Sequence, residues 1–317
     1  MNGILNVLKP AGMTSFDVIA VARKITHQRK IGHTGTLDPS AVGVLPICFG
    51  NATKAIEFMI DKDKVYRAEM TLGVATDTQD SSGKVISSQA VDVNKNEIVN
   101  VCNSFIGELT QLPPMYSAIK IGGKKLYEIA RQGETIERHE RNITIYDINV
   151  IRIWDDIAIF SENENTVQYA TKKVIFDVHC SKGTYIRTLC NDIGVKLGCG
   201  GHMSFLVRTR AGKYDIHSAL TLEEIMELAK DNTLSSNLIP VESVFGDYDK
   251  VQLNEADTAK YNNGVWIKAI FEKENHNTTK RVYDSNGVFL GIGEVFNDGQ
   301  GICLKSKKFF RDSSKIK

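Results

Sequence analysis

The chain has 317 residues, of which 42% are hydrophobic and 24% carry charged side chains. These values are ordinary for a globular protein and exclude a disordered, fibrous or collagen-like chain. The 39 Lys and Arg residues nearly balance the 38 Asp and Glu residues, so the total charge gives no argument for a nucleic-acid partner. A chain of this length forms two domains, or one large domain with an appendage.

The amino terminus has no basic segment followed by an apolar one, so we expect no signal peptide. The longest apolar stretch, residues 41–49, is interrupted by Gly43 and Pro46 and is too short to span a bilayer. The sequence therefore predicts a soluble, cytoplasmic protein.

Charge is unevenly distributed along the chain. Residues 172–213 contain eight Lys or Arg and two Asp, whereas residues 220–260 contain nine acidic residues and three Lys. Residues 1–31 and 302–317 are also basic. If the basic segments converge in space, they form a phosphate-binding surface. If they do not, they are separate solvated faces, and charge alone favours neither arrangement.

The first half of the chain contains recognisable strand and helix patterns. Residues 3–8 are predicted as a strand, and residues 18–25 as a helix that begins with a Thr14–Asp17 capping box. Alternating apolar residues and β-formers predict a strand over 64–72, and residues 77–83 are predicted as a polar turn.

Residues 111–142 are unusual, because paired prolines and paired glycines precede a short basic helix predicted over 124–131. This pattern predicts an arm that lies outside the core. The next predicted elements are a strand over 173–180, a helix over 186–197, and a helix that begins with a capping box at Thr221.

After residue 248 the chain changes to short strands and turns, which is typical of a small β-rich module. We therefore predict a domain over residues 1–247, with the arm as an insertion, and a second domain over 248–317.

The six cysteines contain no C-x-x-C pair and are predicted to be buried, reduced thiols. Cys199 and His202 have a C-x-x-H spacing, but no second ligand pair follows, so no metal site is predicted.

The segment Gly32–Pro39, GHTGTLDP, is the most informative stretch for chemistry. It is not a phosphate-binding P-loop, because no Gly-Lys-Ser/Thr follows at the required spacing. Its glycines allow a close backbone approach, and the proline after Asp38 stiffens the backbone that presents the carboxylate. From local features alone, an Asp-Pro pair is most simply a turn.

This segment, extended to Pro46 as GHTGTLDPSAVGVLP, resembles the catalytic motif of the TruB family of tRNA pseudouridine synthases, of the bacterial type. Further blocks occur in the family's order, and together they span about two thirds of the chain: Lys9–Ser15, Lys64–Arg67, Tyr116–Lys120 running on to Gly133, and Cys180–Thr188. The resemblance implies the α+β class and a pseudouridine synthase fold, with a mixed, mostly antiparallel sheet flanked by helices. It also implies that the β-rich module is a PUA-like RNA-binding domain.

Pseudouridine formation exchanges the N1–C1′ bond of uridine for a C5–C1′ bond and needs no cofactor. The resemblance implies that Asp38 is the nucleophile and leaves open whether it attacks C1′ or C6. It also implies that Arg187 pairs with Asp38 through a two-bond fork and that Tyr66 stacks on the target base and moves a proton. From local features alone, Arg187 would be a surface residue and Tyr66 a core or interface residue.

The target base must leave the RNA stack before it reacts. The resemblance implies that His33 fills the gap in the stack, that Leu206 forms an apolar wall of the uracil pocket, and that Tyr185 contacts the substrate. Basic residues are expected to contact phosphates, namely Lys9 and the arm residues Lys120, Lys124, Lys125 and Arg131.

The function implied by the resemblance is that of a tRNA pseudouridine(55) synthase that acts on the T-arm. The expected partner is tRNA alone, with no membrane, no obligatory protein partner and a monomeric protein. Two alternatives remain open. One is a guide-dependent, dyskerin-type enzyme that acts on ribosomal RNA, and the other is a non-catalytic protein that binds tRNA and helps it to fold.

Overall fold

The computed structural model describes residues 1–117, 119–130, 132–162, 165–268 and 277–311. Its larger part is built on a nine-stranded sheet with the order β1-β3-β12-β4-β11-β10-β7, to which β2 adds beside β3 and β13 beside β12. β3 and β12 run parallel, and the other neighbours pair antiparallel, as the family resemblance implied. In chain order the strands are β1 (Gly3–Lys9), β2 (Ile31–His33), β3 (Val42–Phe49), β4 (Lys64–Leu72), β7 (Gly107–Gln111), β10 (Arg141–Glu162), β11 (Asn165–Cys180), β12 (Gly201–Ala211) and β13 (Tyr214–Asp215).

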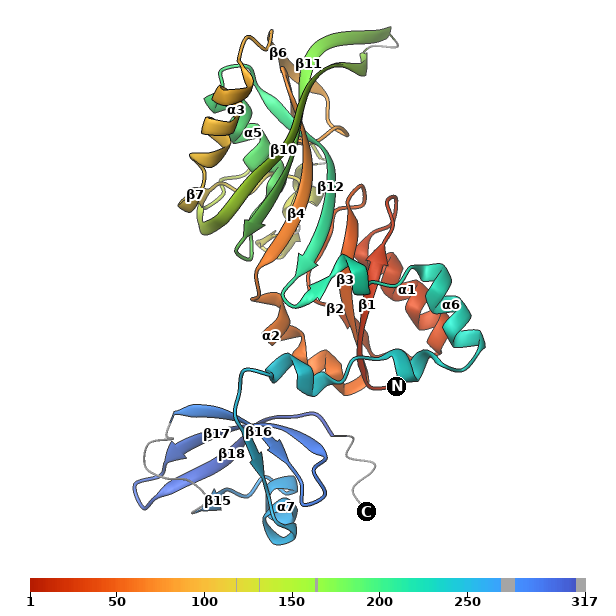
Figure 1. The fold of residues 1–317 in the computed structure, drawn as a ribbon, viewed down its shortest axis with the longest axis vertical. Helices are drawn as coiled ribbons and strands as arrows, with labels where there is room; N and C mark the ends of the chain where they lie inside the picture. The colour runs from red at the N-terminus through yellow and green to blue at the C-terminus, as the bar shows by residue number, and fades with distance from the viewer. Residues whose placement is uncertain (118, 131, 163–164, 269–276, 312–317) are drawn as a thin grey trace.

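Helices cover this sheet in two groups (Figure 1). α3 (Lys95–Asn103) and α5 (Ile186–Lys196) pack on the part formed by β4, β10 and β11, and α1 (Ser15–Thr26) and α6 (Leu222–Lys230) pack beside β1 and β3. The capping boxes predicted at Thr14 and Thr221 are both formed, and the helix predicted over 186–197 is confirmed as α5. The shorter helices are η1 (Gly50–Ala55), α2 (Ile56–Ile60), η2 (Ile216–Ser218), η3 (Leu234–Asn237) and η4 (Val241–Phe245).

The arm differs from its prediction at its ends, because Gln111 belongs to β7 and Arg141 and Asn142 belong to β10, and it also differs at its helix. Its basic helix was expected over 124–131, but α4 (Leu126–Ala130) begins only at Leu126. Gly122 and Gly123 both have positive φ, at 58° and 86°, and make a turn that joins β8 (Lys120–Ile121) to β9 (Lys124–Lys125). The arm lysines therefore lie in a small hairpin. A second small pair, β5 (Val74–Thr76) with β6 (Val85–Ser88), lies on either side of the predicted turn.

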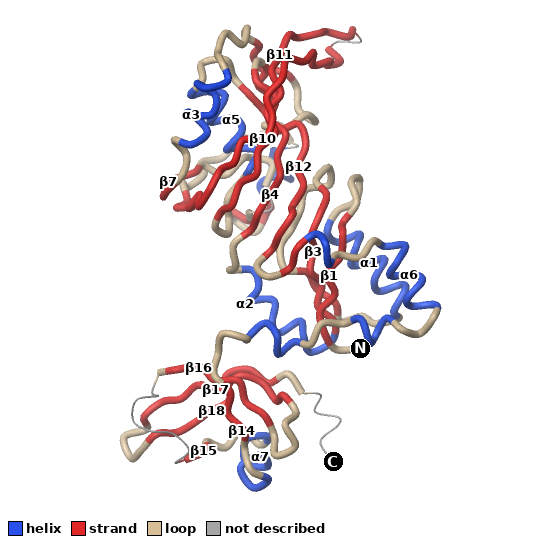
Figure 2. The backbone as a smooth tube through the Cα atoms, in the orientation of Figure 1, coloured by secondary structure: helices blue, strands red, loops and turns tan. Residues whose placement is uncertain are grey.

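The carboxy-terminal part forms a separate five-stranded sheet with the order β14-β16-β17-β18-β15, as the predicted β-rich module requires (Figures 1 and 2). α7 (Glu255–Asn262) accompanies it. The strands are β14 (Lys250–Gln252), β15 (Ile267–Lys268), β16 (Thr278–Tyr283), β17 (Phe289–Asn297) and β18 (Ile302–Phe309).

Aromatic side chains join the two sheets, and we call Phe58, Phe245, Phe289 and Phe310 the aromatic seam. The Phe245 ring lies 5.2 Å from that of Phe58 and 5.3 Å from that of Phe310, between ring centroids. These rings belong to one core cluster that also contains Val44 of β3. The hydrophobic core is thus continuous between the β-rich module and the larger part of the protein.

Candidate active site

The segment that contains Asp38 is an ordered loop between β2 and β3. Leu37 is buried in the core, and its backbone N–H donates to the Ser15 hydroxyl at 2.9 Å. The carbonyl of Pro39 accepts from the backbone N–H of Gly12 at 2.8 Å. The loop is therefore anchored on both sides of Asp38 by the turn between β1 and α1, which fixes where the carboxylate points.

The Asp38 carboxylate lies beside the Arg187 guanidinium, with Oδ2 3.1 Å from Nε. The geometry is not the two-bond fork that the resemblance implied. Nη1 of Arg187 lies 3.4 Å from Asp80 Oδ2, and Nη2 donates to the Tyr116 carbonyl at 2.6 Å. Nη1 also donates to the Thr78 carbonyl at 3.4 Å, so the three nitrogens face four acceptors, two of which are carboxylates.

Arg187 occupies a position where a cation needs such partners. It lies in the first turn of α5, where the helix dipole disfavours positive charge, and only 6% of its side chain is exposed. A guanidinium at this depth is stable only when acidic and carbonyl groups surround it. Local features alone suggested a surface residue, whereas the pairing with Asp38 is the one that the resemblance implied.

Asp80 was not identified from the sequence, which gave it only as part of a polar turn. In the structure its Oδ1 accepts from the Thr78 hydroxyl at 2.7 Å and from the Ser82 backbone N–H at 3.0 Å. Its other oxygen is thereby directed at Arg187. The clustering of small polar residues around Asp80 was the available signal, but its partner lies 107 residues away in the chain.

The environment of Asp38 disfavours the loss of its proton. Burial and the nearby Asp80 carboxylate raise its pKa, and Arg187 and Lys9 act in the opposite direction. The side chain nevertheless remains 37% exposed, so one side of the carboxylate is open to an incoming group. This combination of a desolvated carboxylate, a fixed cation and an open face suits covalent attack on a substrate.

Tyr66 projects from β4, where it pairs in register with Arg208 of β12 and Val178 of β11. Burial is the main cause of the raised pKa of its phenol, and the Arg208 guanidinium lowers that pKa. Asp38 also contributes to the electrostatic environment of Tyr66. Tyr66 of β4 is therefore close enough to the Asp38 loop for the Asp38 carboxylate to influence its phenol.

Lys9 does not lie where phosphate contact would require it. Its side chain is 0% exposed, and Nζ donates to the carbonyls of Pro10 at 2.8 Å and Pro39 at 3.3 Å. The prediction that Lys9 binds RNA phosphates is therefore wrong for this structure. The turn after β1 and the Asp38 loop cover the ammonium group, so Lys9 stabilises the loop through its hydrogen bond to the Pro39 carbonyl.

Burial lowers the pKa of Lys9 from 10.5 to about 8, and this makes a prediction about stability. Between pH 8 and 10.5 the unfolded chain keeps a proton that the folded chain has released, so raising the pH stabilises the folded protein. In Lys9→Met this contribution is absent. Over that range, the free energy of unfolding of the wild type should therefore rise with pH relative to that of the variant. Denaturant titrations at several pH values test this, and parallel curves for the two proteins would contradict it.

His33, at the end of β2, packs its ring edge against Phe16 with ring centroids 5.2 Å apart. Its Nδ1 accepts from the Gly35 backbone N–H at 3.3 Å. Burial and the positive charge of Arg208 lower its pKa, which favours the neutral ring at pH 7. A neutral His33 ring at the start of the loop that contains Asp38 is compatible with stacking against a base.

Leu206 and Tyr185 lie on two elements of the same site. Leu206 of β12 is 7% exposed and lines a small hollow of about 50 Å³ together with Asp80. Tyr185 is the N-cap residue of α5, and its backbone is bracketed by two hydrogen bonds with the Gln111 side chain. Burial raises the pKa of the Tyr185 phenol, and Asp38 adds to that shift.

The arm residues are only partly described. Lys124 is exposed in β9. Lys120 and Lys125 lie in the paired strands β8 and β9, but their side chains are outside the described residues, as is the whole of Arg131. The structure therefore provides the hairpin on which these predicted phosphate contacts would be mounted.

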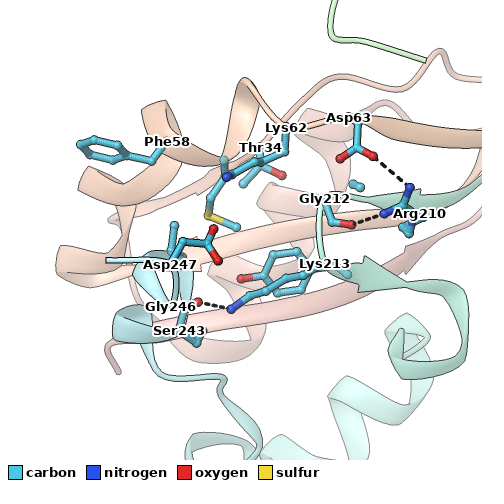
Figure 3. A pocket seen from close by; sticks show the side chains of 14 residues that line it. Thr34, Phe58, Lys62, Asp63, Arg210, Gly212, Lys213, Ser243, Gly246 and Asp247 are labelled. Carbon is cyan, nitrogen blue, oxygen red and sulfur yellow. Dashed lines mark hydrogen bonds and ion pairs between the residues drawn. The ribbon is translucent and has the colours of Figure 1, made fainter. Parts of the chain in front are cut away.

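A larger cavity of about 430 Å³ lies elsewhere, between α2, the end of β12 and η4 (Figure 3). Figure 3 shows the Arg210–Asp63 pair and the Lys213 ammonium directed at Ser243 along its wall. Thr34 is the one residue between β2 and β3 that lines this cavity, and neither Asp38 nor Tyr66 lines it. Size alone therefore does not locate the chemistry in this protein.

The described residues contain neither a metal site nor a helix that could span a membrane. Among the described residues, no group of three His, Cys, Asp or Glu side chains could hold a metal ion. His202 Nδ1 instead lies 2.8 Å from the Val74 carbonyl oxygen, and Cys199 is buried as a free thiol. In the part of the chain that the structure describes, no helix has both the length and the apolar character needed to cross a bilayer.

Comparisons with known proteins agree with this geometry. Residues 23–186 match the family model described as TruB family pseudouridylate synthase, N-terminal domain. The chain belongs to this family. Residues 187–246 match the tRNA pseudouridylate synthase B C-terminal domain, and residues 250–302 match the C-terminal domain of pseudouridine synthase II TruB. The matched regions thus extend from α1 into β18.

Two relatives cover almost the whole TruB-family chain. The tRNA pseudouridine synthase B of Alkaliphilus oremlandii (strain OhILAs) is 50% identical over 310 residues, which are 98% of this chain and 91% of the relative. The protein of the same name from Clostridioides difficile (strain 630) is 40% identical over 319 residues, covering 98% of this chain and 100% of the relative.

Solved structures share the fold of this TruB-family chain. A chain in the crystal structure of a Cbf5-Nop10-Gar1 complex has a TM-score of 0.69 and 26% identity, with 98% of this chain and 86% of that chain covered. A chain in the structure of an H/ACA RNP bound to a substrate RNA containing 2'-deoxyuridine has a TM-score of 0.69, 24% identity, and coverages of 98% and 85%. The pseudouridine synthase fold implied by the sequence is confirmed, and the protein is an isomerase.

Proposed function

We propose that this protein is a tRNA pseudouridine(55) synthase that acts on the T-arm loop and uses Asp38 as its nucleophile. The observation that supports this best is the partly exposed Asp38 carboxylate held against the buried Arg187 guanidinium. The relatives named tRNA pseudouridine synthase B, which match almost the whole chain, support tRNA as the substrate.

The reaction divides into two easier steps when a carboxylate forms a transient bond with the substrate. The N1–C1′ bond of uridine breaks, the uracil turns, and a C5–C1′ bond forms, after which the C5 proton is lost and N1 holds a proton. Arg187 favours the ionised form of the Asp38 carboxylate and orients it, and Asp80 holds Arg187 from its other side. Tyr66 is assigned the proton step and the stacking contact with the base.

RNA recognition requires that the target uridine leave its stack, at a cost of a few kcal/mol. His33 is assigned the gap that the uridine leaves, Leu206 the apolar wall of the uracil pocket, and Tyr185 a further substrate contact. The arm lysines and the β-rich module are assigned the phosphate contacts that hold the RNA.

We propose a catalytic domain over residues 1–247 and a PUA-like RNA-binding domain over 248–317. The separate five-stranded sheet, which begins at Lys250, supports this division. We further propose that the protein is a monomer that acts in the cytoplasm on tRNA without an obligatory protein partner. In this it would differ from the guide-dependent branch, since the solved structures described above are multi-component complexes.

The decisive experiment incubates the purified chain, with nothing added, with an unmodified tRNA transcript and with an isolated T-arm hairpin. We expect pseudouridine at position 55 of both RNAs and no pseudouridine in a transcript with cytidine at that position. Activity that appears only after a guide RNA and its proteins are added would favour the dyskerin-type alternative. Tight tRNA binding without any pseudouridine would favour a binding or folding protein.

The arm makes a separate prediction about affinity. Replacing Lys120, Lys124 and Lys125 with Gln should weaken binding to all tRNAs equally, because phosphate contacts carry no direct sequence information. Each lost contact should reduce the slope of log affinity against log salt by about 0.7 to 0.9. Binding titrations at several salt concentrations measure this slope.

A matched control replaces three exposed lysines outside the arm, Lys84, Lys95 and Lys230, with Gln. If the control changes the slope as much as the arm variant does, the arm is not a specific phosphate-binding element.

A further inference from the structure

Arg208 is a buried cation that the mechanism above does not use. It lies in β12, is 2% exposed, and pairs in register with Gly43 of β3 on one side and Tyr66 of β4 on the other. Among the described residues, no carboxylate lies within ion-pair distance of its guanidinium. A buried charge without a carboxylate partner is costly unless strong hydrogen-bond acceptors surround it.

The acceptors of Arg208 belong to the two ends of the catalytic loop. Nε donates to the Val44 carbonyl at 2.7 Å, and Nη2 donates to the Gly35 carbonyl at 3.1 Å. These two residues lie on either side of Asp38 in the chain. The guanidinium therefore links the two ends of the loop through hydrogen bonds and fixes the segment that carries the nucleophile.

The close approach of β3 to β12 at this point depends on a glycine. Gly43 has φ of 114°, and a Cβ atom on it would lie 2.2 Å from the Arg208 carbonyl oxygen. No larger residue can occupy this place without moving one of the strands. The backbone thus brings Arg208 against the loop, and the arrangement does not depend on a flexible surface side chain.

Tyr66 stands directly opposite Arg208 in the antiparallel pair of β4 and β12, so the two side chains project from the same face of the sheet and the phenol and the guanidinium can meet. An arginine side chain only donates hydrogen bonds, so the phenol oxygen must accept. The phenol then keeps its own proton available for donation to another group. One buried side chain thereby links the Asp38 loop to the tyrosine that we assign to the proton step.

We propose that Arg208 is a positioning residue that orients the Tyr66 hydroxyl toward the substrate and holds it in register with the Asp38 loop. The proposal rests on the function assigned above, because it takes Tyr66 as the residue that handles the proton. Arg208 itself does not touch the substrate, since its side chain is buried beneath the loop.

The charges around Tyr66 give the proposal a spectroscopic signature. Arg208 from β12 lowers the pKa of the phenol, whereas burial, Cys180 at the end of β11 and Asp38 from the loop raise it. Removing the positive charge of Arg208 must therefore raise the pKa of Tyr66. If Arg208 only stabilised the fold and did not face the phenol, its replacement would leave the pKa of Tyr66 unchanged.

The test uses Arg208→Gln and Arg208→Lys in the full-length protein, with fluorotyrosine placed at position 66. Fluorine NMR titration of the RNA-free protein should show a higher pKa for the phenol in Arg208→Gln, and a smaller rise in Arg208→Lys, which keeps the charge. Arg210→Gln, two residues further along β12 and paired with Asp63, is the matched control and should leave the titration unchanged.

Single-turnover rates at saturating tRNA provide the second readout. We expect a loss of about 10²-fold in Arg208→Gln, as for other misplaced catalytic groups, with tRNA affinity nearly unchanged. In a Tyr66→Phe background the same substitution should cost much less, because the hydroxyl that Arg208 orients is already absent. Should Arg208→Gln fail to fold, Arg208→Lys carries both comparisons.

An unchanged phenol titration, or an equal rate loss in both backgrounds, overturns the proposal and limits Arg208 to support of the loop. The titration needs no turnover. If the wild-type chain makes no pseudouridine in tRNA, the proposed function is refuted. If Arg208→Gln still raises the pKa of Tyr66 in that case, the contact between Tyr66 and Arg208 is nevertheless supported.

Discussion

Asp38→Asn is expected to abolish pseudouridine formation while tRNA affinity stays within a few fold of the wild type. The amide has the size of the carboxylate but cannot attack the substrate. Affinity depends mainly on phosphate and loop contacts that the substitution leaves in place. Pseudouridine mapping and binding titrations on the same protein preparation measure the two quantities.

The control for Asp38→Asn is Asp61→Asn, which neutralises an exposed carboxylate paired with Lys182 and should leave turnover unchanged. Mass spectrometry must show that the amide has not deamidated back to the acid. Substantial turnover by the intact amide would remove Asp38 from the role of nucleophile.

Tyr66→Phe is expected to reduce single-turnover rates by about 10²–10⁴-fold, the usual contribution of a positioned proton donor or acceptor. The ring can still stack on the base, so binding should change little. Tyr146→Phe, which alters an exposed tyrosine of β10, is the control and should behave like the wild type.

Comparison with Tyr66→Ala separates the two roles assigned to Tyr66. If Tyr66→Phe keeps nearly full activity while Tyr66→Ala is inactive, the residue is a stacking surface only. In that case the positioning role of Arg208 would also have no hydroxyl on which to act.

Local sequence signals predicted those elements of the fold that local physics determines. The capping boxes at Thr14 and Thr221 each satisfy free N–H groups at a helix start, and both are formed. The basic helix of the arm was placed two residues early, because Lys124 and Lys125 are good helix formers. The Gly122–Gly123 turn allows these lysines to pair with β8 instead.

The candidate site was predictable only where a contiguous motif carried it. Asp38, Tyr66 and Arg187 stand in recognisable blocks, and the structure brings the first two into one electrostatic neighbourhood and places Arg187 against Asp38. Asp80 and Arg208 were missed because each acts through residues far away in the chain. Their roles depend on how β12 and the turn after β5 pack against the loop.

The error at Lys9 has the same physical origin. A lysine beside a Pro-Ala-Gly turn reads as exposed from the sequence, whereas its burial depends on the Pro39 segment that folds over it. Which side of a turn is covered is a property of tertiary packing, and neither hydropathy nor spacing records it.

The aromatic seam has a mechanical consequence. Because Phe310 at the end of the β-rich module and Val44 beside the catalytic loop belong to one core cluster, the two sheets cannot rotate past each other without opening that cluster. Lys308 adds an ion pair to Glu57 at 2.6 Å across the same boundary. These contacts hold the two sheets at one relative position in this structure, so an RNA that contacts both sheets must match the spacing between them.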